Sequence, residues 1–416
     1  MKLKKLKLFE GIGVEVEYMI VADKDLHVLP IADTLLSGGS GKKHCERKFG
    51  RVAWSNELSL HVIEIKTLAP MTDTAELPRL LQPQIKQINS FLAKHQAKLL
   101  PGGAHPFMDP LTETQVWPHG NRMIYKTYDR IFNCSGHGWA NLQSTHLNIS
   151  FSNDQEFSRL HAAVRFLLPL LPALAASSPL IEGKATGSLD NRMLFYAKNQ
   201  KKFPRNAGKI IPEANIKSRK DYETRILMPM YKSIAKLDPQ KRLQYEWLNS
   251  RGAIARFERY ALEIKLLDCQ ECLQAETAVC AFIIAALKFL VNEQTISFSK
   301  LSAWPNKPLL KIYADAVRKG LKAVCPDTAY LKAWGIKDKK TCGYDKIIRH
   351  IIGQITAQGY LDDKAFGHVY DLILSQGNLS QRILRSLNKD VSRENIIRVY
   401  QRLADCLEQN KLFEGK

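Results

Sequence analysis

Two carboxylates stand two residues apart near the start of the chain, in the segment 11–21. An extended strand has a side-chain period of two, so Glu15 and Glu17 would share one face while Val14 and Val16 lie on the other. Neighbouring carboxylates on a half-buried strand repel each other unless a cation neutralises them. No lysine or arginine occupies the alternate positions of this segment. The pattern therefore predicts a cation site.

Two later segments repeat this alternation. In the segment 144–151, His146 and Asn148 would share a polar face opposite apolar residues. Farther along the chain, Glu263 and Lys265 would lie side by side, opposite leucine and isoleucine side chains. Each segment would thus have a polar face whose side chains could take part in chemistry.

Glu57 and Glu64 form a fourth acidic segment. They lie seven residues apart, an odd number, so an unbroken strand would point them to opposite faces. We therefore expect Glu57 to lie beyond a bend if both serve one site. The candidate metal ligands are Glu15, Glu17, Glu57, Glu64, His146 and Glu263.

This ligand set consists of carboxylates with one imidazole. Such ligands suit Mg²⁺ or Mn²⁺ better than a structural zinc ion. Ions of this kind ordinarily bridge nucleotide oxygens during phosphoryl transfer. The alternative is an ordinary antiparallel sheet with one solvated face and a histidine in a structural role, and the pattern alone leaves it open.

The chain has 416 residues, 45% of them hydrophobic, and can bury a large core. Sixty-one basic residues against 41 acidic ones give a net charge of +20, which favours anionic partners. Basic residues concentrate at 2–7 and at 198–220, and we expect the second stretch to be a loop, either closing over phosphates or simply solvated. No recognisable nucleic-acid-binding module is present, so nucleic acid is a secondary expectation.

The N-terminus has no apolar run of signal-peptide length, so we expect a cytoplasmic protein with reduced cysteines. The apolar stretches 166–176 and 278–291 are too short for membrane spans and predict core helices. The glycine-rich stretch 36–43 lacks the leading glycine and the final Ser/Thr of a phosphate-binding loop. We expect it to be a flexible loop.

Strand patterns at 8–21, 58–68 and 144–151 alternate irregularly with helical patterns at 77–97 and 156–176. This order predicts an α+β fold with a largely antiparallel sheet. After Glu293 the strand pattern fades, and Ser392 is typical of an N-cap before a helix. We expect a catalytic domain over 1–292 and, over 293–416, a helical accessory region that covers the sheet or supports a homo-oligomer.

Several motifs together resemble one known family, glutamate-cysteine ligase family 2, whose members are carboxylate-amine ligases with a catalytic domain similar to that of glutamine synthetase. The resemblance spans about residues 8–291. It rests on Gly13-Val-Glu15-Val-Glu17, Glu57 to Glu64, Pro101-Gly-Gly-Ala-His105, His137 to Asn148, Ser177-Ser-Pro, Thr186-Gly187 and Arg251 to Glu263.

The resemblance implies a curved antiparallel sheet whose six candidate ligands hold two or three Mg²⁺ ions on ATP. It also implies that the γ-phosphate activates a substrate carboxylate as an acyl phosphate, which an amine then attacks to form an amide. Glutamate is the family's default carboxylate, and the product would resemble γ-glutamyl-cysteine. The rivals are an ATP-dependent phosphotransferase acting on an amine or guanidine, and a noncatalytic nucleotide or RNA binder.

Four basic side chains are the expected catalytic groups, because guanidinium and ammonium groups bind acyl phosphate and carboxylate. A structural ion pair is the alternative for each arginine. At Lys265 relatives often have arginine, and lysine lacks the bidentate fork. The catalytic candidates are Arg192, Arg251, Arg256 and Lys265, and the nucleotide-binding candidates are Arg251, Arg256 and Asn148.

Overall fold

The computed structural model describes residues 5–38, 42–206 and 210–416, so the centre of the glycine-rich stretch and parts of both basic stretches lie outside it. Eight strands form one sheet in the order β2-β3-β4-β1-β6-β10-β9, with β5 also paired to β1, and all these pairings are antiparallel. The α+β class is confirmed. The strands of this sheet are β1 (Ile12–Ala22), β2 (Glu46–Phe49), β3 (Val52–Asn56), β4 (Val62–Thr67), β5 (Ala97–Leu100), β6 (Ser144–Ser150), β9 (Ala253–Arg256) and β10 (Ala261–Asp268).

Helices cover the apolar face of the sheet, where alternate residues of β1 such as Val14 and Val16 are fully buried. The covering helices are α2 (Leu77–Leu92), α5 (Asp154–Leu167), α6 (Leu171–Ala175) and α10 (Leu273–Val291). Two helical stretches, Asp154–Ala175 and Leu273–Val291, have the length and composition to cross a membrane, but 94% and 78% of their apolar windows are buried inside the protein. Their apolar character is therefore accounted for by the core, as predicted.

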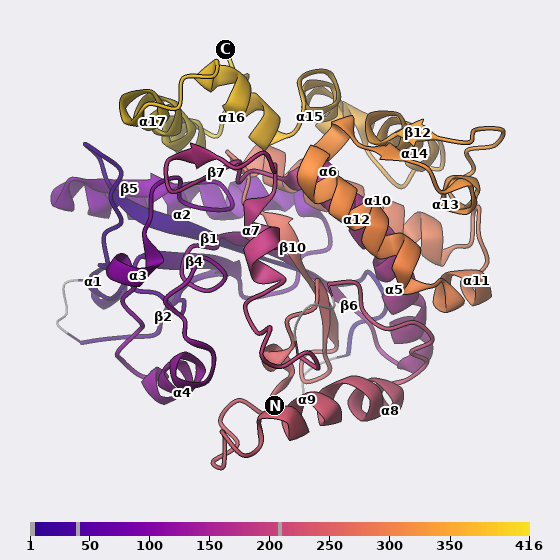
Figure 1. The fold of residues 1–416 in the computed structure, drawn as a ribbon, viewed down its shortest axis with the longest axis horizontal. Coiled ribbons are helices and arrows are strands. Elements are labelled where there is room, and N and C mark those ends of the chain that lie inside the picture. The colour runs from indigo at the N-terminus through magenta and orange to yellow at the C-terminus, as the bar shows by residue number, and fades with distance from the viewer. Residues whose placement is uncertain (1–4, 39–41, 207–209) are drawn as a thin grey trace.

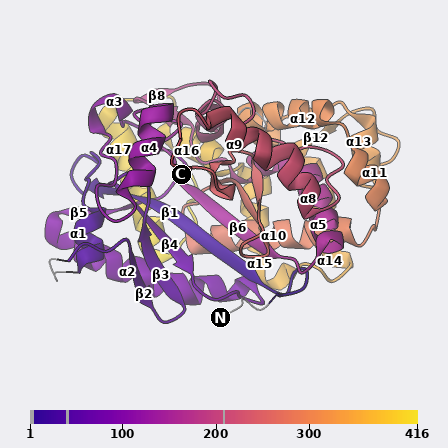
Figure 2. The same ribbon diagram turned by 90° about the horizontal axis from the view of Figure 1, so that it is seen from below.

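A second layer lies over the opposite, polar face, so that the sheet is sandwiched between two layers (Figure 2). It contains α4 (Arg122–Phe132), α7 (Asn191–Tyr196), α8 (Arg219–Tyr222) and α9 (Met228–Ile234). Near the sheet margins are α1 (Ala32–Ser37), α3 (Pro110–Glu113) and the hairpin of β7 (Leu180–Ile181) and β8 (Lys184–Ala185). Shorter turns of helix are Thr74–Glu76, Ala93–His95, Leu168–Leu170, Glu223–Leu227, Glu246–Leu248 and Gly320–Lys322.

A β-bulge interrupts β10. Ile264 pairs with Leu147 of β6, but the next paired residue is Leu267, opposite Thr145. One extra residue on a bulged strand reverses the alternation of faces beyond it. Asp268, the last residue of β10, therefore lies on the polar side of the sheet.

The C-terminal helices pack against the sheet and its covering helices (Figure 1), and their apolar residues share two hydrophobic clusters with residues of the sheet. Apolar residues of α12, α14 and α15 belong to the same hydrophobic cluster as the strands, while α16 and α17 pack against Met19 and Val21 of β1. Ser392 caps α17 through its hydroxyl, as predicted. The helices are α11 (Phe298–Ala303), α12 (Asn306–Lys319), α13 (Thr328–Ala333), α14 (Tyr344–Ala357), α15 (Asp363–Gln376), α16 (Leu379–Leu387) and α17 (Arg393–Gln409), with a small hairpin of β11 (Val324–Cys325) and β12 (Cys342–Gly343).

Candidate active site

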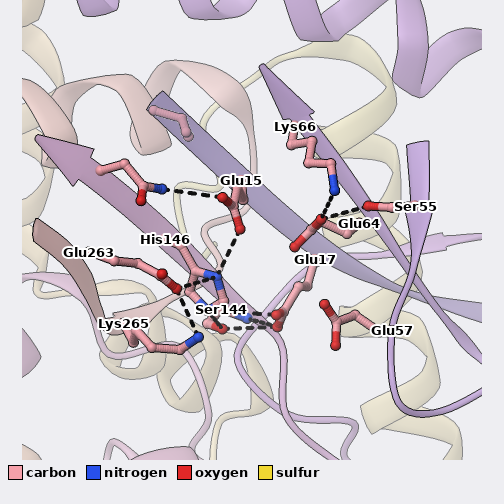
Figure 3. Close-up of polar contacts among 12 residues, drawn as sticks. Glu15, Glu17, Ser55, Glu57, Glu64, Lys66, Ser144, His146, Glu263 and Lys265 are labelled. Atoms are coloured by element: carbon pink, nitrogen blue, oxygen red, sulfur yellow. Dashed lines mark hydrogen bonds and ion pairs between the residues drawn. The ribbon is translucent and has the colours of Figure 1, made fainter. Parts of the chain in front are cut away.

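The antiparallel register gathers the predicted acidic residues on the polar face of the sheet (Figure 3). Glu15 lies opposite His146 of β6, and Glu17 lies opposite Glu64 of β4. Directly opposed residues in an antiparallel pair share a face with their Cβ atoms about 5 Å apart. Glu263 joins from β10 beside β6. Four strands thus supply one cluster, named here the acidic cluster: Glu15, Glu17, Glu64, His146 and Glu263.

His146 lies at the centre of the acidic cluster. Its Nδ1 is 3.4 Å from Oε2 of Glu15 and 3.7 Å from Oε1 of Glu263, and its Nε2 is 3.6 Å from Oε1 of Glu17. Two triplets, Glu15-His146-Glu263 and Glu17-Glu64-His146, each offer three ligand atoms within 4.8 Å of one another. Such spacing lets each triplet close on a single ion.

Glu57 lies in the connection between β3 and β4, so the predicted bend is confirmed. Burial raises the pKa of Glu57 well above its ordinary value, and the charges of Glu17 and Glu64 raise it further. Burial and the charge of Glu15 also raise the pKa of Glu64, although Lys66, whose Nζ is 3.1 Å away, opposes the shift. On this side of the site, the nearby cations do not balance the buried negative charge of Glu57 and Glu64.

On the opposite side of the acidic cluster, cations balance the negative charge of the carboxylates. Burial alone would raise the pKa of Glu263, but Lys265, Arg256 and His146 outweigh it and lower that pKa. Lys265 Nζ donates to Oε1 of Glu263 at 2.9 Å, and Arg256 Nη1 donates to Oε2 at 2.7 Å. Glu15 is also buried, yet chiefly the hydrogen bond with His146 lowers its pKa to about 2. These two carboxylates are therefore held ionised, as metal ligation requires.

Ser144 is part of the site although the sequence analysis did not select it. Its backbone N–H and its hydroxyl donate to Oε2 of Glu17 at 2.8 and 2.9 Å, and the hydroxyl lies 2.9 Å from Nε2 of His146. The available signal was its position two residues before His146, on the same face of β6. A serine there orients Glu17 and His146, and His146 is the side chain that the two triplets share.

A cavity of about 210 Å³ opens beside the acidic cluster, with Glu17, Glu57 and His146 on its floor and with Arg192 and Lys265 in its lining. Aromatic rings form another wall: Tyr128 lies 5.3 Å from Trp139 and 5.6 Å from Trp247 between ring centroids. Drug-sized ligands occupy pockets of roughly 300–1,000 Å³. This cavity therefore suits a small substrate rather than a whole nucleotide.

The other predicted residues lie in different surroundings. Asn148 Nδ2 donates to Oε1 of Glu15 at 3.2 Å, which places it at the edge of the cluster. Arg251 is not brought to the cavity: it is buried, and its Nη2 and Nε donate to Glu213 at 2.6 and 2.8 Å. Arg251 is not one of the described residues that line the cavity. Its position favours the structural ion pair over a catalytic or nucleotide-binding role.

Known proteins share both the sequence pattern and the fold. An uncharacterised protein of Archaeoglobus fulgidus is 34% identical over 402 residues, covering 97% of this chain and all of that protein. A putative glutamate–cysteine ligase of Rubrobacter xylanophilus is 29% identical over 179 residues, 42% of this chain and 45% of that protein. Glutamate–cysteine ligase of Francisella tularensis, solved in complex with AMP, aligns with a TM-score of 0.60 at 12% identity over 100% of this chain and 91% of that one.

A bifunctional glutathione synthetase of Pasteurella multocida aligns with a TM-score of 0.59 at 12% identity, over 96% of this chain and 52% of that one. Fold and family together support an enzyme of the ATP-dependent carboxylate-amine ligase class. The chain belongs to glutamate-cysteine ligase family 2, whose model matches residues 11–402. The match runs into α17, so the resemblance read from motifs, which ended near 291, was too short.

Proposed function

We propose that this protein is an ATP- and Mg²⁺-dependent ligase that joins a carboxylate to an amine through an acyl phosphate. The observation that carries the proposal is the pair of acidic triplets meeting at His146 on the floor of a small cavity. The cavity also contains the cations Arg192 and Lys265, which suit anionic substrate groups.

The donor set fits Mg²⁺, with Mn²⁺ as a substitute, because it is rich in carboxylate oxygen. The raised pKa values of Glu57 and Glu64 also fit, since they reflect burial first and then repulsion between carboxylates, and a bound divalent ion would relieve that repulsion. The triplet Glu17-Glu64-His146, with Glu57 nearby, would hold one ion. The triplet Glu15-His146-Glu263 would hold the other. Bound Mg²⁺ would supply charge stabilisation for phosphate oxygens.

The chemistry proceeds in two displacements. A carboxylate oxygen of the first substrate attacks the γ-phosphorus of ATP, and the bond to the departing ADP oxygen breaks. The amine nitrogen then attacks the acyl carbon, phosphate leaves with the electrons of the carbon–oxygen bond, and the amine loses a proton. Arg192 and Lys265 would hold the anionic groups in the cavity, and Arg256 keeps Glu263 ionised beside them.

The small cavity supports substrates of amino-acid size, and the family supplies glutamate as the first carboxylate to test. The screen described next identifies the amine substrate. A cytoplasmic location is still a prediction from the sequence.

The test is an ATP-turnover screen with Mg²⁺ over a panel of amino acids and amines, with mass spectrometry of the products. ADP, phosphate and an amide in equal amounts would support the ligase. A phosphorylated amine or guanidine without amide would instead identify a phosphotransferase. Binding of nucleotide or RNA that weakens with salt, with no turnover on any pair, would identify a noncatalytic binder. A parallel reaction with EDTA controls for the metal.

A further inference from the structure

Residues of two motifs that the proposed chemistry does not use meet at one side chain, Asp268. The Ser177 N–H and the Ser178 hydroxyl each donate to Oδ2 of Asp268 at 2.8 Å. A Cβ atom on Gly103 would come within 2.4 Å of the same carboxylate, so only glycine leaves room for it. The Ser177-Ser-Pro motif thus donates hydrogen bonds to this buried carboxylate, and the Pro101-Gly-Gly motif packs closely against it.

The other oxygen of Asp268 holds Arg192. Arg192 Nε donates to Oδ1 at 2.5 Å, and both side chains are about 1% exposed. The Arg192 backbone N–H donates to the Ser178 hydroxyl at 3.1 Å, and Nη1 donates to the Lys265 carbonyl oxygen at 3.3 Å. Burial opposes the charge on Arg192, but Asp268 and Asp190 outweigh it and raise its pKa. The guanidinium is therefore charged and fixed on two sides.

One nitrogen of Arg192 is left over. Its Nη2 is buried and has no hydrogen-bond partner within residues 5–38, 42–206 and 210–416, while Arg192 itself lines the cavity. A buried charged donor without a partner is costly, so such groups are normally satisfied by protein, water or ligand. Because Arg192 lines the cavity, an anionic ligand group bound there would lie beside its guanidinium.

We propose that Asp268 is a positioning residue that fixes Arg192 so that its remaining nitrogen binds the anionic group of the carboxylate substrate. This inference rests on the proposed ligase function. A long, flexible side chain loses conformational freedom when it binds, and a preformed ion pair removes that cost before the substrate arrives. Asp268 acts only through Arg192 and does not touch the substrate.

A second buried ion pair provides a control that distinguishes a positioning role of Asp268 from a purely structural one. Arg382 Nη1 donates to Glu271 at 2.5 Å, both side chains are fully buried, and Arg382 does not line the cavity described above. Glu271→Gln therefore removes a comparable buried carboxylate whose pair does not line the cavity. It is expected to lower the thermal stability as Asp268→Asn does, with the KM for each substrate unchanged.

The experiment measures kcat, the KM for ATP and the KM for the best carboxylate of the panel. Asp268→Asn and Arg192→Ala are each expected to raise the carboxylate KM by about 10- to 100-fold, the range for a lost charge-assisted hydrogen bond, with the KM for ATP little changed. Because the residues act as a unit, the double variant should lose no more than the worse single variant.

An unchanged carboxylate KM in Asp268→Asn, or fully additive losses in the double variant, would overturn the inference while the ligase function stands. If the wild type turns over no pair in the panel, the proposed function fails and the inference falls with it. If Asp268→Asn does not fold, Ser178→Ala replaces it. That variant removes one hydrogen bond to Asp268 and the one from the Arg192 backbone, so a smaller rise in the same KM is expected and an unchanged KM counts against the inference.

Discussion

Replacing Glu263 by glutamine is expected to lower turnover by about 10²–10³-fold at a modest cost in stability. Glu263 is about 1% exposed and accepts hydrogen bonds from Arg256 at 2.7 Å and from Lys265 at 2.9 Å. Glutamine retains one acceptor oxygen, so one of these bonds is lost, at about 1.5–3 kcal/mol for a charged partner. Relief of the repulsion with Glu15 offsets part of this cost.

We therefore expect Glu263→Gln to lower the unfolding free energy by about 2 kcal/mol and the Tm by at most about 8 °C. The loss of activity should be far larger, because the substitution removes a ligand of the triplet that Glu263 forms with Glu15 and His146. A single missing transition-state donor typically costs about 10²–10³ in kcat. Release of ADP, followed over a range of Mg²⁺ concentrations, measures the effect.

Glu258→Gln is the matched control. Glu258 is half exposed and accepts from Nη2 of the same Arg256 at 2.7 Å, but it belongs to neither triplet. Turnover in this variant should stay within about threefold of wild type, as for other surface ion pairs. Wild-type turnover and Mg²⁺ dependence in Glu263→Gln would refute the assignment of this carboxylate to the site.

Three further predictions concern the scaffold. Arg251→Ala should lower the unfolding free energy by about 3 kcal/mol in urea titrations, because Glu213 loses its bidentate partner; a rise in the KM for ATP with stability unchanged would instead support the role expected from sequence. Burial lowers the pKa of His105 to about 3 while the unfolded chain protonates near 6.5, so stability should fall as the pH drops below about 6.5, and His105 should contribute about 2 kcal/mol of that loss at pH 5. Burial also lowers the pKa of His61 and His161, so His105→Gln should reduce the slope without removing it, and an identical slope would contradict the prediction. Removal of 293–416 should yield an unfolded or insoluble fragment, since α12, α14 and α15 share the main core; a fragment with a native circular dichroism spectrum that binds nucleotide would instead establish the boundary at 292.

Much of the acidic cluster was predictable because alternation within a regular strand is a local property. The period of two placed Glu15 and Glu17 on one face of their strand and His146 on the polar face of its own. The antiparallel register then set His146 opposite Glu15. The odd spacing of Glu57 and Glu64 also predicted the bend between β3 and β4. These inferences needed no knowledge of distant contacts.

The residues that sequence reasoning missed depend on irregular or distant structure. In an unbroken β10, Asp268 would share the apolar face of Leu262 and Ile264, and only the bulge turns it toward Arg192. Arg251 is separated by 38 residues from the Glu213 that holds it, and no local pattern indicates that pairing. The extent of the family was underestimated because the C-terminal helices carry no chemical motif, although their apolar faces complete the core.

Crystals of the protein grown with ADP and Mn²⁺, with diffraction recorded at the manganese absorption edge, test the central claim most directly. The account predicts anomalous peaks at bonding distance, roughly 2.1 Å, from oxygens of Glu15 and Glu263 and from those of Glu17 and Glu64, on either side of His146. Data from Glu263→Gln crystals should lose the first peak. Nucleotide bound with no manganese in the acidic cluster, or manganese held only elsewhere, would contradict the account.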